Sequence, residues 1–140
     1  MHVLFIGDVV GTPGVRAIAT VLPCLFDKYK IDLVVANAEN IADGNGITPS
    51  TASELFALGI DVLTNGNHAW DKEEAFDYIK TEPRLLRPYN YPEGTPGSGW
   101  YVVTTRHGYK VGILNVLGNR FMPPNISCPF ETVDQALENK

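Results

Sequence analysis

The sequence predicts an α/β fold built from parallel βαβ units. Three short apolar runs, "HVLFIG", "DLVVAN" and "DVLT", alternate with segments in which apolar residues recur at helical spacing. This alternation produces a parallel sheet with helices packed on its faces. The 140 residues are 44% hydrophobic, which is sufficient for one ordinary core. We therefore expect residues 1–140 to belong to a single domain.

Capping residues mark the first two helices. Thr12 and Pro13 predict an N-cap and a first-turn proline for the helix in "VRAIATVLPCLFDKYK". Thr48 and Pro49 predict the same start for a second helix in "STASELFALG", which Gly59 ends.

The stretch "LTNGNHAWD" after the third strand is either a turn or a site. Asn65-Gly66 is a strong hairpin signal, because both residues tolerate positive φ. A hairpin needs a second strand, however, and the residues that follow are acidic first and then apolar at helical spacing. We therefore predict a strand-to-helix loop, followed by a helix from about Asp71 to Lys80.

The pattern changes after Pro83. A proline-, glycine- and tyrosine-rich stretch precedes two β-rich runs around "RHGY", which predict an antiparallel hairpin near residues 100–116. "PFETVDQALEN" predicts one more helix. The chain stops at Lys140 where another strand is expected, so we expect the domain to be incomplete.

Composition excludes several classes of partner. Eleven Lys and Arg against 16 Asp and Glu give a net charge of -5, and no stretch concentrates basic residues, so polymeric nucleic acid is not expected to bind by charge. No apolar run approaches the ~20 residues of a membrane span. Cys24 and Cys128 lie far apart without a CxxC pair or a secretory leader, so we expect two reduced thiols and a cytoplasmic location.

Polar side chains follow all three predicted strands. Asp8 follows the first, Glu39 and Asn40 the second, and Asn67 and His68 the third. Singly, each residue fits a cap or a solvated loop. Ligands of parallel sheets collect beyond the carboxyl ends of the strands, and carboxylates crowded there repel each other unless a cation lies between them. We interpret the group as a shared metal site, with structural capping as the alternative.

These residues carry a resemblance to a known family. Gly7-Asp8, "NAEN" and "GNH" resemble the first three metal-ligand blocks of the calcineurin-like metallophosphoesterases. With "VLFIGDVVGTPG", "GNHAWD" and "RPYNYP", the whole chain is similar to the YmdB-like branch, whose members act on 2′,3′-cyclic nucleotides among other phosphodiesters. The resemblance implies a β-sandwich core flanked by helices, of which this chain covers about half.

The resemblance also implies roles for the polar residues. Asp8, Glu39 and Asn40 would hold one divalent metal ion, and Glu39 would bridge to a second that also takes Asn67. Iron and manganese are the expected ions. An activated hydroxide would attack a small phosphodiester in line, and His68 would protonate the leaving alkoxide.

Two departures from the broad superfamily fit this branch: Val10 stands where a ligand histidine is usual, and Glu39 where aspartate is usual. The relatives are longer, and their second half holds three further histidine ligands that this chain lacks. The alternative to an enzyme is therefore a non-catalytic binding or scaffolding domain with an incomplete metal site. A third hypothesis is that a separate polypeptide supplies the other half of the site. The sequence does not decide whether the chain forms a homo-oligomer.

Several other polar and aromatic residues can also be interpreted from the sequence. Asp71 either orients the His68 imidazole or caps the helix that follows, and capping is favoured. His2 and His107 are expected at the surface. Trp70, Tyr89 and Tyr91 either stack on a base or pack in the core.

Overall fold

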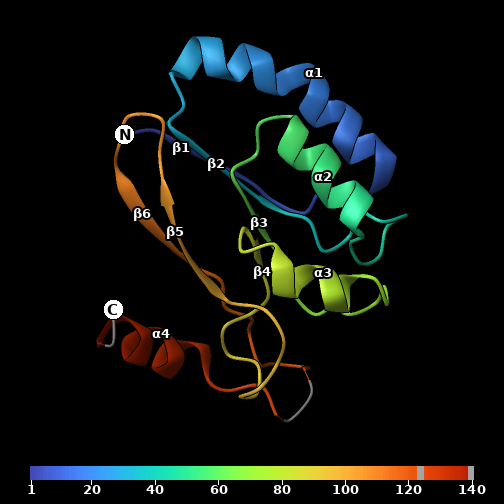
Figure 1. Cartoon of the computed structure of the whole chain (residues 1–140), viewed down its shortest axis with the longest axis vertical. Helices are drawn as coiled ribbons and strands as arrows, with labels where there is room; N and C mark the ends of the chain where they lie inside the picture. The colour runs from blue at the N-terminus through green and yellow to red at the C-terminus, as the bar shows by residue number, and fades with distance from the viewer. Residues whose placement is uncertain (123–124, 139–140) are drawn as a thin grey trace.

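The computed structural model describes residues 1–122 and 125–138, and its elements alternate as the sequence predicts (Figure 1). The strands and helices follow in the order β1 (Val3–Ile6), α1 (Gly11–Tyr29), β2 (Leu33–Asn37), α2 (Pro49–Ala57), β3 (Val62–Thr64), α3 (Ala75–Thr81), β4 (Leu85–Leu86), β5 (Trp100–Thr104), β6 (Lys110–Leu114) and α4 (Pro129–Glu138).

The first four strands form one parallel sheet in the order β1-β2-β3-β4. Val3 pairs with Leu33 at the start of the first ladder, and each later strand is added on the same side. Strands β5 and β6 form a separate antiparallel hairpin, as predicted near residues 100–116. The expected α/β fold with parallel units and a hairpin is confirmed.

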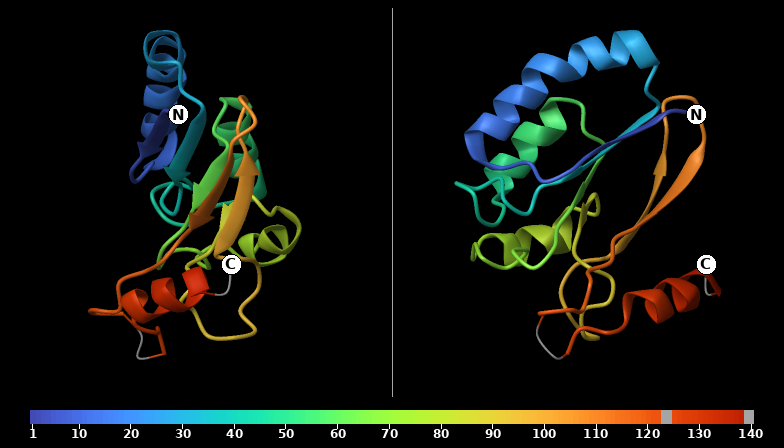
Figure 2. Two further views of the ribbon diagram at one scale, coloured as in Figure 1. Left: turned by 90° about the vertical axis from the view of Figure 1, so that its left-hand side faces the viewer. Right: turned by 180° about the vertical axis from the view of Figure 1, so that it is seen from behind.

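The sheet lies between helices and the hairpin. Figures 1 and 2 show α1 and α2 on one face of the sheet and β5–β6 on the other. Two apolar clusters reflect these layers because successive strand residues face opposite sides. Val34 and Leu63 pack with residues of the three helices that follow β1, β2 and β3, whereas Val35 and Val62 pack against the hairpin. The packing of the parallel sheet against the hairpin is the sandwich arrangement that the resemblance implies.

The starts of two helices test the predicted capping residues. Thr48 caps α2 as predicted: its hydroxyl accepts from the Thr51 N–H at 3.3 Å, and the Thr51 hydroxyl accepts from the Thr48 N–H at 3.0 Å. The prediction that Thr12 caps α1 is wrong, because the N-cap is Val10 and no side chain caps it. Pro13 still lies in the first turn, where a missing N–H costs nothing.

The third helix begins later than predicted. Helix α3 starts at Ala75 rather than near Asp71, and residues 71–74 form turns. Gly46 lies against this segment, where an added Cβ would meet Lys72 Cγ at 2.9 Å. Turn hydrogen bonds replace helical ones here: Asp71 N donates to His68 O at 3.3 Å, and Ala75 N donates to Lys72 O at 3.1 Å.

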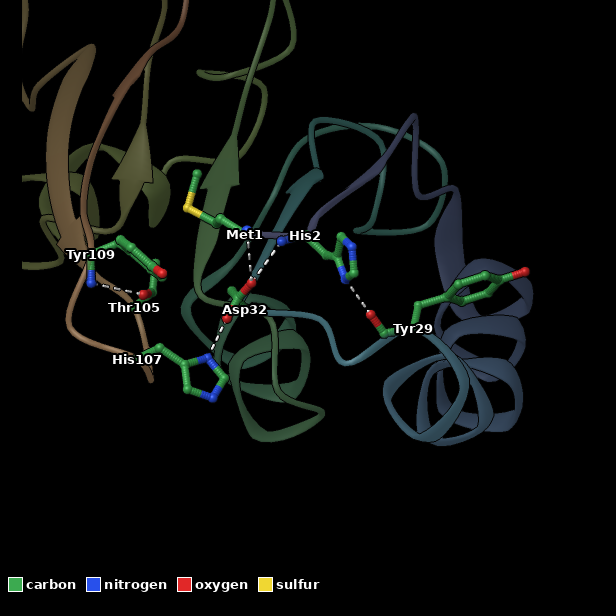
Figure 3. Close-up of polar contacts among 7 residues, drawn as sticks. All are labelled: Met1, His2, Tyr29, Asp32, Thr105, His107 and Tyr109. Carbon is green, nitrogen blue, oxygen red and sulfur yellow. Dashed lines mark hydrogen bonds and ion pairs between the residues drawn. The ribbon is translucent and has the colours of Figure 1, made fainter.

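The amino end of the sheet carries a closed polar cluster around the buried Asp32 (Figure 3). Its carboxylate accepts from the His2 N–H at 2.6 Å, contacts His107 Nδ1, and lies 4.0 Å from the amino terminus. Because His107 belongs to the β5–β6 turn, the cluster joins the hairpin to the start of β2. His2 and His107 are exposed, as expected.

Cys24 and Cys128 are free thiols, as expected. Within the described ranges, none of the helices combines the length and the apolar composition needed to cross a lipid bilayer.

Candidate metal centre

Backbone hydrogen bonds bring the strand ends together. Val9 N donates to Asn37 O, and Ala38 N donates to Thr64 O, both at 2.9 Å. Asn65 N donates to Leu86 O at the same distance. A residue within three positions of the end of each of these strands is therefore bonded to the last residue of the next strand. The loops after β1, β2 and β3 start from one common edge.

Asp8 and Asn40 meet across this edge. The Asn40 Nδ2 donates to Asp8 Oδ1 at 2.7 Å, and Asn40 O accepts from Gly11 N at 3.0 Å. Asp8 itself has a φ of 37°, in the left-handed region that few non-glycine residues occupy. Such strained backbone is common at functional sites. The Oδ1 of Asn40 takes no part in the bond to Asp8 and stays available as a ligand.

Glu39 lies against the loop after β3. Its Oε2 accepts weakly from His68 N at 3.4 Å, and its Oε1 from Asn37 Nδ2 at 3.2 Å. A Cβ on Gly66 would stand 2.4 Å from Glu39 Oε2, so only glycine admits the carboxylate here. This contact explains the "GNH" glycine by close approach rather than by a hairpin turn.

His68 pairs with Asp71 rather than standing alone. Its Nδ1 lies 2.5 Å from Asp71 Oδ2. Asp71 does not cap α3, whose N-cap is Glu74, so the favoured capping interpretation is wrong. The contact with His68 agrees with the other interpretation, in which Asp71 orients the imidazole. Because Nδ1 is engaged, Nε2 is the ring atom left to face a substrate. Both side chains are about one third exposed, so the pair is accessible to solvent.

Asn67 lies between the two loop residues that contact Glu39. Asn67 is exposed, and it lines a cavity together with Trp70 and Tyr91. The structure therefore places every predicted ligand at one edge: Asp8 beside Asn40, and Glu39 beside the backbone that carries Asn67.

The donor set fits a cation that prefers oxygen ligands. Two carboxylates supply negative charge, and two amides supply neutral oxygen donors. The set is also incomplete: in residues 1–122 and 125–138, no three His, Cys, Asp or Glu side chains are grouped as a metal site requires. The residues present therefore fit part of a metal site.

Sequence comparison decides the family. The model of the family described as YmdB-like protein matches residues 4–140. The chain belongs to this family. The motifs "VLFIGDVVGTPG", "NAEN", "GNHAWD" and "RPYNYP" thus predicted the correct branch. Their ligand and catalytic roles in this YmdB-like chain remain predictions.

The proteins similar to this chain are considerably longer than it. It is 43% identical over 137 residues to the 2′,3′-cyclic-nucleotide 2′-phosphodiesterase of Bacillus subtilis (strain 168), a match that covers 98% of this chain and 51% of that protein. The crystal structure of a hypothetical protein from Thermus thermophilus aligns with a TM-score of 0.90 and 41% identity, over 100% of this chain and 54% of that one.

A crystal structure described as a novel phosphatase from Mycoplasma pneumoniae aligns with a TM-score of 0.89 and 29% identity, over 99% of this chain and 50% of that one. This YmdB-like chain therefore spans about half the length of the relatives it matches.

Sequence reasoning missed the residues that fix the loop after β3. The Tyr91 hydroxyl donates to Gly66 O at 2.9 Å, and Asn115 Nδ2 donates to Asn65 O at 2.7 Å. The Asn65 side chain is 2% exposed, and in the described ranges neither its nitrogen nor its oxygen has a hydrogen-bond partner. Only the tyrosine-rich composition of "RPYNYP" gave any signal for these contacts.

Proposed function

We propose that this chain provides one half of the catalytic site of a metal-dependent phosphodiesterase. The observation that carries the proposal is the pair of contacts at one sheet edge, Asp8 with Asn40 and Glu39 with the loop that carries Asn67, in a chain of the YmdB-like family. With Asn67 they would hold two divalent cations, iron or manganese. The remaining ligands would come from the part of the fold that the longer relatives have in addition.

The expected substrate is a 2′,3′-cyclic nucleotide, as the name of the Bacillus subtilis relative suggests. In this reaction water adds to phosphorus, the bond between phosphorus and O2′ breaks, and a 3′-phosphomonoester is formed. The metal ions, when bound, would supply Lewis-acid chemistry at the phosphoryl oxygens and at water. No basic patch is then required, in agreement with the net charge of -5.

His68 would give its proton to the leaving O2′. An imidazole is suited to this step because it exchanges protons near neutral pH. Asp71 Oδ2 lies 2.5 Å from Nδ1, so Nε2 is the ring nitrogen that would carry the transferred proton. His68 is adjacent to Asn67, so the proton donor and the phosphate ligands belong to the same short loop.

A metal and activity assay tests this function. The protein, loaded with Mn²⁺ or Fe²⁺ and freed of excess ion, is expected to bind metal and to hydrolyse bis-p-nitrophenyl phosphate, with two metal equivalents in the assembled site. Asp43, an exposed carboxylate on the loop after β2, offers a control: Asp43→Asn should change neither result.

The second candidate is a non-catalytic metal-binding or scaffolding domain. The incomplete ligand set in the described chain favours it over an unrelated enzyme class. One metal equivalent or none, without hydrolysis, would support this candidate and contradict the first.

A further inference from the structure

A cavity of about 350 Å³ opens beside the candidate metal centre. Asn67, a proposed metal ligand, belongs to its lining, so the cavity adjoins the position proposed for the phosphate. Its other walls include Trp70, Tyr91, Leu117 and Ile126. The volume lies within the range of small-molecule sites.

The two aromatic rings form a firmly supported wall. Their centroids are 6.3 Å apart, with an angle of 34° between the planes. Trp70 packs on the apolar core and lies 4.8 Å from Phe76, and the Tyr91 hydroxyl donates to Gly66 O. Burial, and then the carboxylates of Glu39 and Asp71, raise the pKa of Tyr91, so this hydroxyl stays protonated.

The lining has the chemistry of a site for a neutral heterocycle. Leu117, Met122 and Ile126 supply apolar surface, and the amides of Asn67 and Asn125 supply both donors and acceptors. None of the described lining residues is charged, so the cavity does not suit a phosphate. Flat heterocycles stack on aromatic rings and offer hydrogen-bonding edges to amides.

We propose that this cavity holds the base of a nucleotide whose phosphate lies at Asp8, Glu39, Asn40 and Asn67. The inference rests on the proposed function and extends it, because the position of the base then contributes to substrate selection. Stacking on an aromatic side chain contributes about 1–3 kcal/mol per base, which corresponds to roughly 5- to 150-fold in affinity.

Binding without catalysis tests the cavity. Adenosine is titrated into the protein by calorimetry, with ribose as the ligand that lacks a base. Tyr91→Leu removes a ring and should weaken adenosine binding at least 10-fold, whereas Tyr91→Phe keeps the ring and should restore binding. Tyr109→Leu removes an exposed ring at the hairpin turn and is the matched control, with no expected effect.

Leu117→Trp fills the cavity and provides a second test, with circular dichroism to verify folding. It should raise the ratio of KM for a 2′,3′-cyclic nucleotide to KM for 1,2-cyclic glycerol phosphate, which has no base, at least 10-fold. Equal binding of adenosine and ribose, or adenosine binding that is indifferent to Tyr91→Leu and Leu117→Trp, would overturn the proposal.

The two proposals fail in different ways. If the protein hydrolyses the glycerol ester and the cavity variants bind adenosine as the wild type does, the base site is contradicted. The proposed phosphodiesterase function is unaffected by that result. Cavity-dependent adenosine binding without hydrolysis of either ester would support the base site and contradict the catalytic function.

Discussion

The two ends of the parallel sheet both gather carboxylates and histidines, yet they differ in how far these groups satisfy one another. At the amino end, both oxygens of the buried Asp32 carboxylate have partners, one bonded to His2 N and the other to His107. At the carboxyl end, within residues 1–122 and 125–138, the Asp8 carboxylate has one hydrogen bond, from Asn40, and the Glu39 carboxylate has contacts of 3.2 and 3.4 Å.

This difference separates a structural carboxylate from a candidate ligand. Hydrogen bonds from His2 N–H and then from His107 hold the pKa of Asp32 below its ordinary value of 3.8, so its charge serves to join the hairpin to the sheet. Asp8 and Glu39 come from different strands and keep oxygen lone pairs that the described chain does not use. A metal ion would satisfy those lone pairs.

The largest effect is expected where a bridging ligand is lost. Glu39→Gln should abolish binding of the second metal equivalent and reduce phosphodiester hydrolysis to near background, because a neutral amide does not hold two dications together. Metal analysis and turnover on bis-p-nitrophenyl phosphate measure this effect. Full metal content in the variant would show that Glu39 is no ligand.

The two histidine–aspartate pairs provide the next comparison. His68→Ala should lower kcat about 10²- to 10⁴-fold, the usual contribution of a general acid, while metal content stays nearly unchanged. His107→Ala removes the histidine of the structural pair and should leave kcat unchanged while lowering the denaturation midpoint. Unaltered turnover in the first variant would remove His68 from the mechanism.

A smaller effect is expected from Gly66→Ala. The new Cβ would stand 2.4 Å from Glu39 Oε2, so the carboxylate has to move, and metal affinity should fall about 10- to 100-fold. Gly118→Ala is the matched control, because Gly118 has open space around its Cβ position and no positive φ. Equal metal affinity in both variants would show that the position of Glu39 does not matter.

The smallest effect concerns pH. Because the folded pKa of Asp32 lies below its ordinary value, its contribution to stability is complete above about pH 4 and is lost as the pH falls through the folded pKa. The Asp32→Asn variant should therefore lose less stability than the wild type as the pH is lowered from 5. Urea midpoints at several pH values measure this difference. Asp134→Asn, at an exposed position on α4, is the control and should follow the pH dependence of the wild type. A wild-type midpoint that is independent of acid pH would contradict the role of Asp32.

Local sequence patterns predicted most of the fold but not its long-range contacts. Apolar runs gave β1, β2 and β3, and Thr48 gave the start of α2. Strand β4 has two residues, too few to show a period, and it exists because Leu85 and Leu86 pair with β3. The residues around "RPYNYP" therefore looked like loop only.

The candidate site was predictable in composition and not in detail. Motifs named Asp8, Glu39 and His68, because parallel strand ends meet at one edge. The partner of Asp71 depends on where α3 begins, and the helical pattern placed that start near Asp71 rather than at Ala75. The Tyr91–Gly66 contact spans 25 residues, a separation that no local pattern encodes.

The central claim is that the carboxyl edge of the sheet binds divalent cations and the amino edge does not. Anomalous diffraction from crystals grown with Mn²⁺ tests this claim most directly. We expect Mn²⁺ peaks within coordination distance of Asp8, Glu39, Asn40 and Asn67 oxygens, and none beside Asp32. A metal-free carboxyl edge, or a peak only at the Asp32–His107 pair, would contradict it.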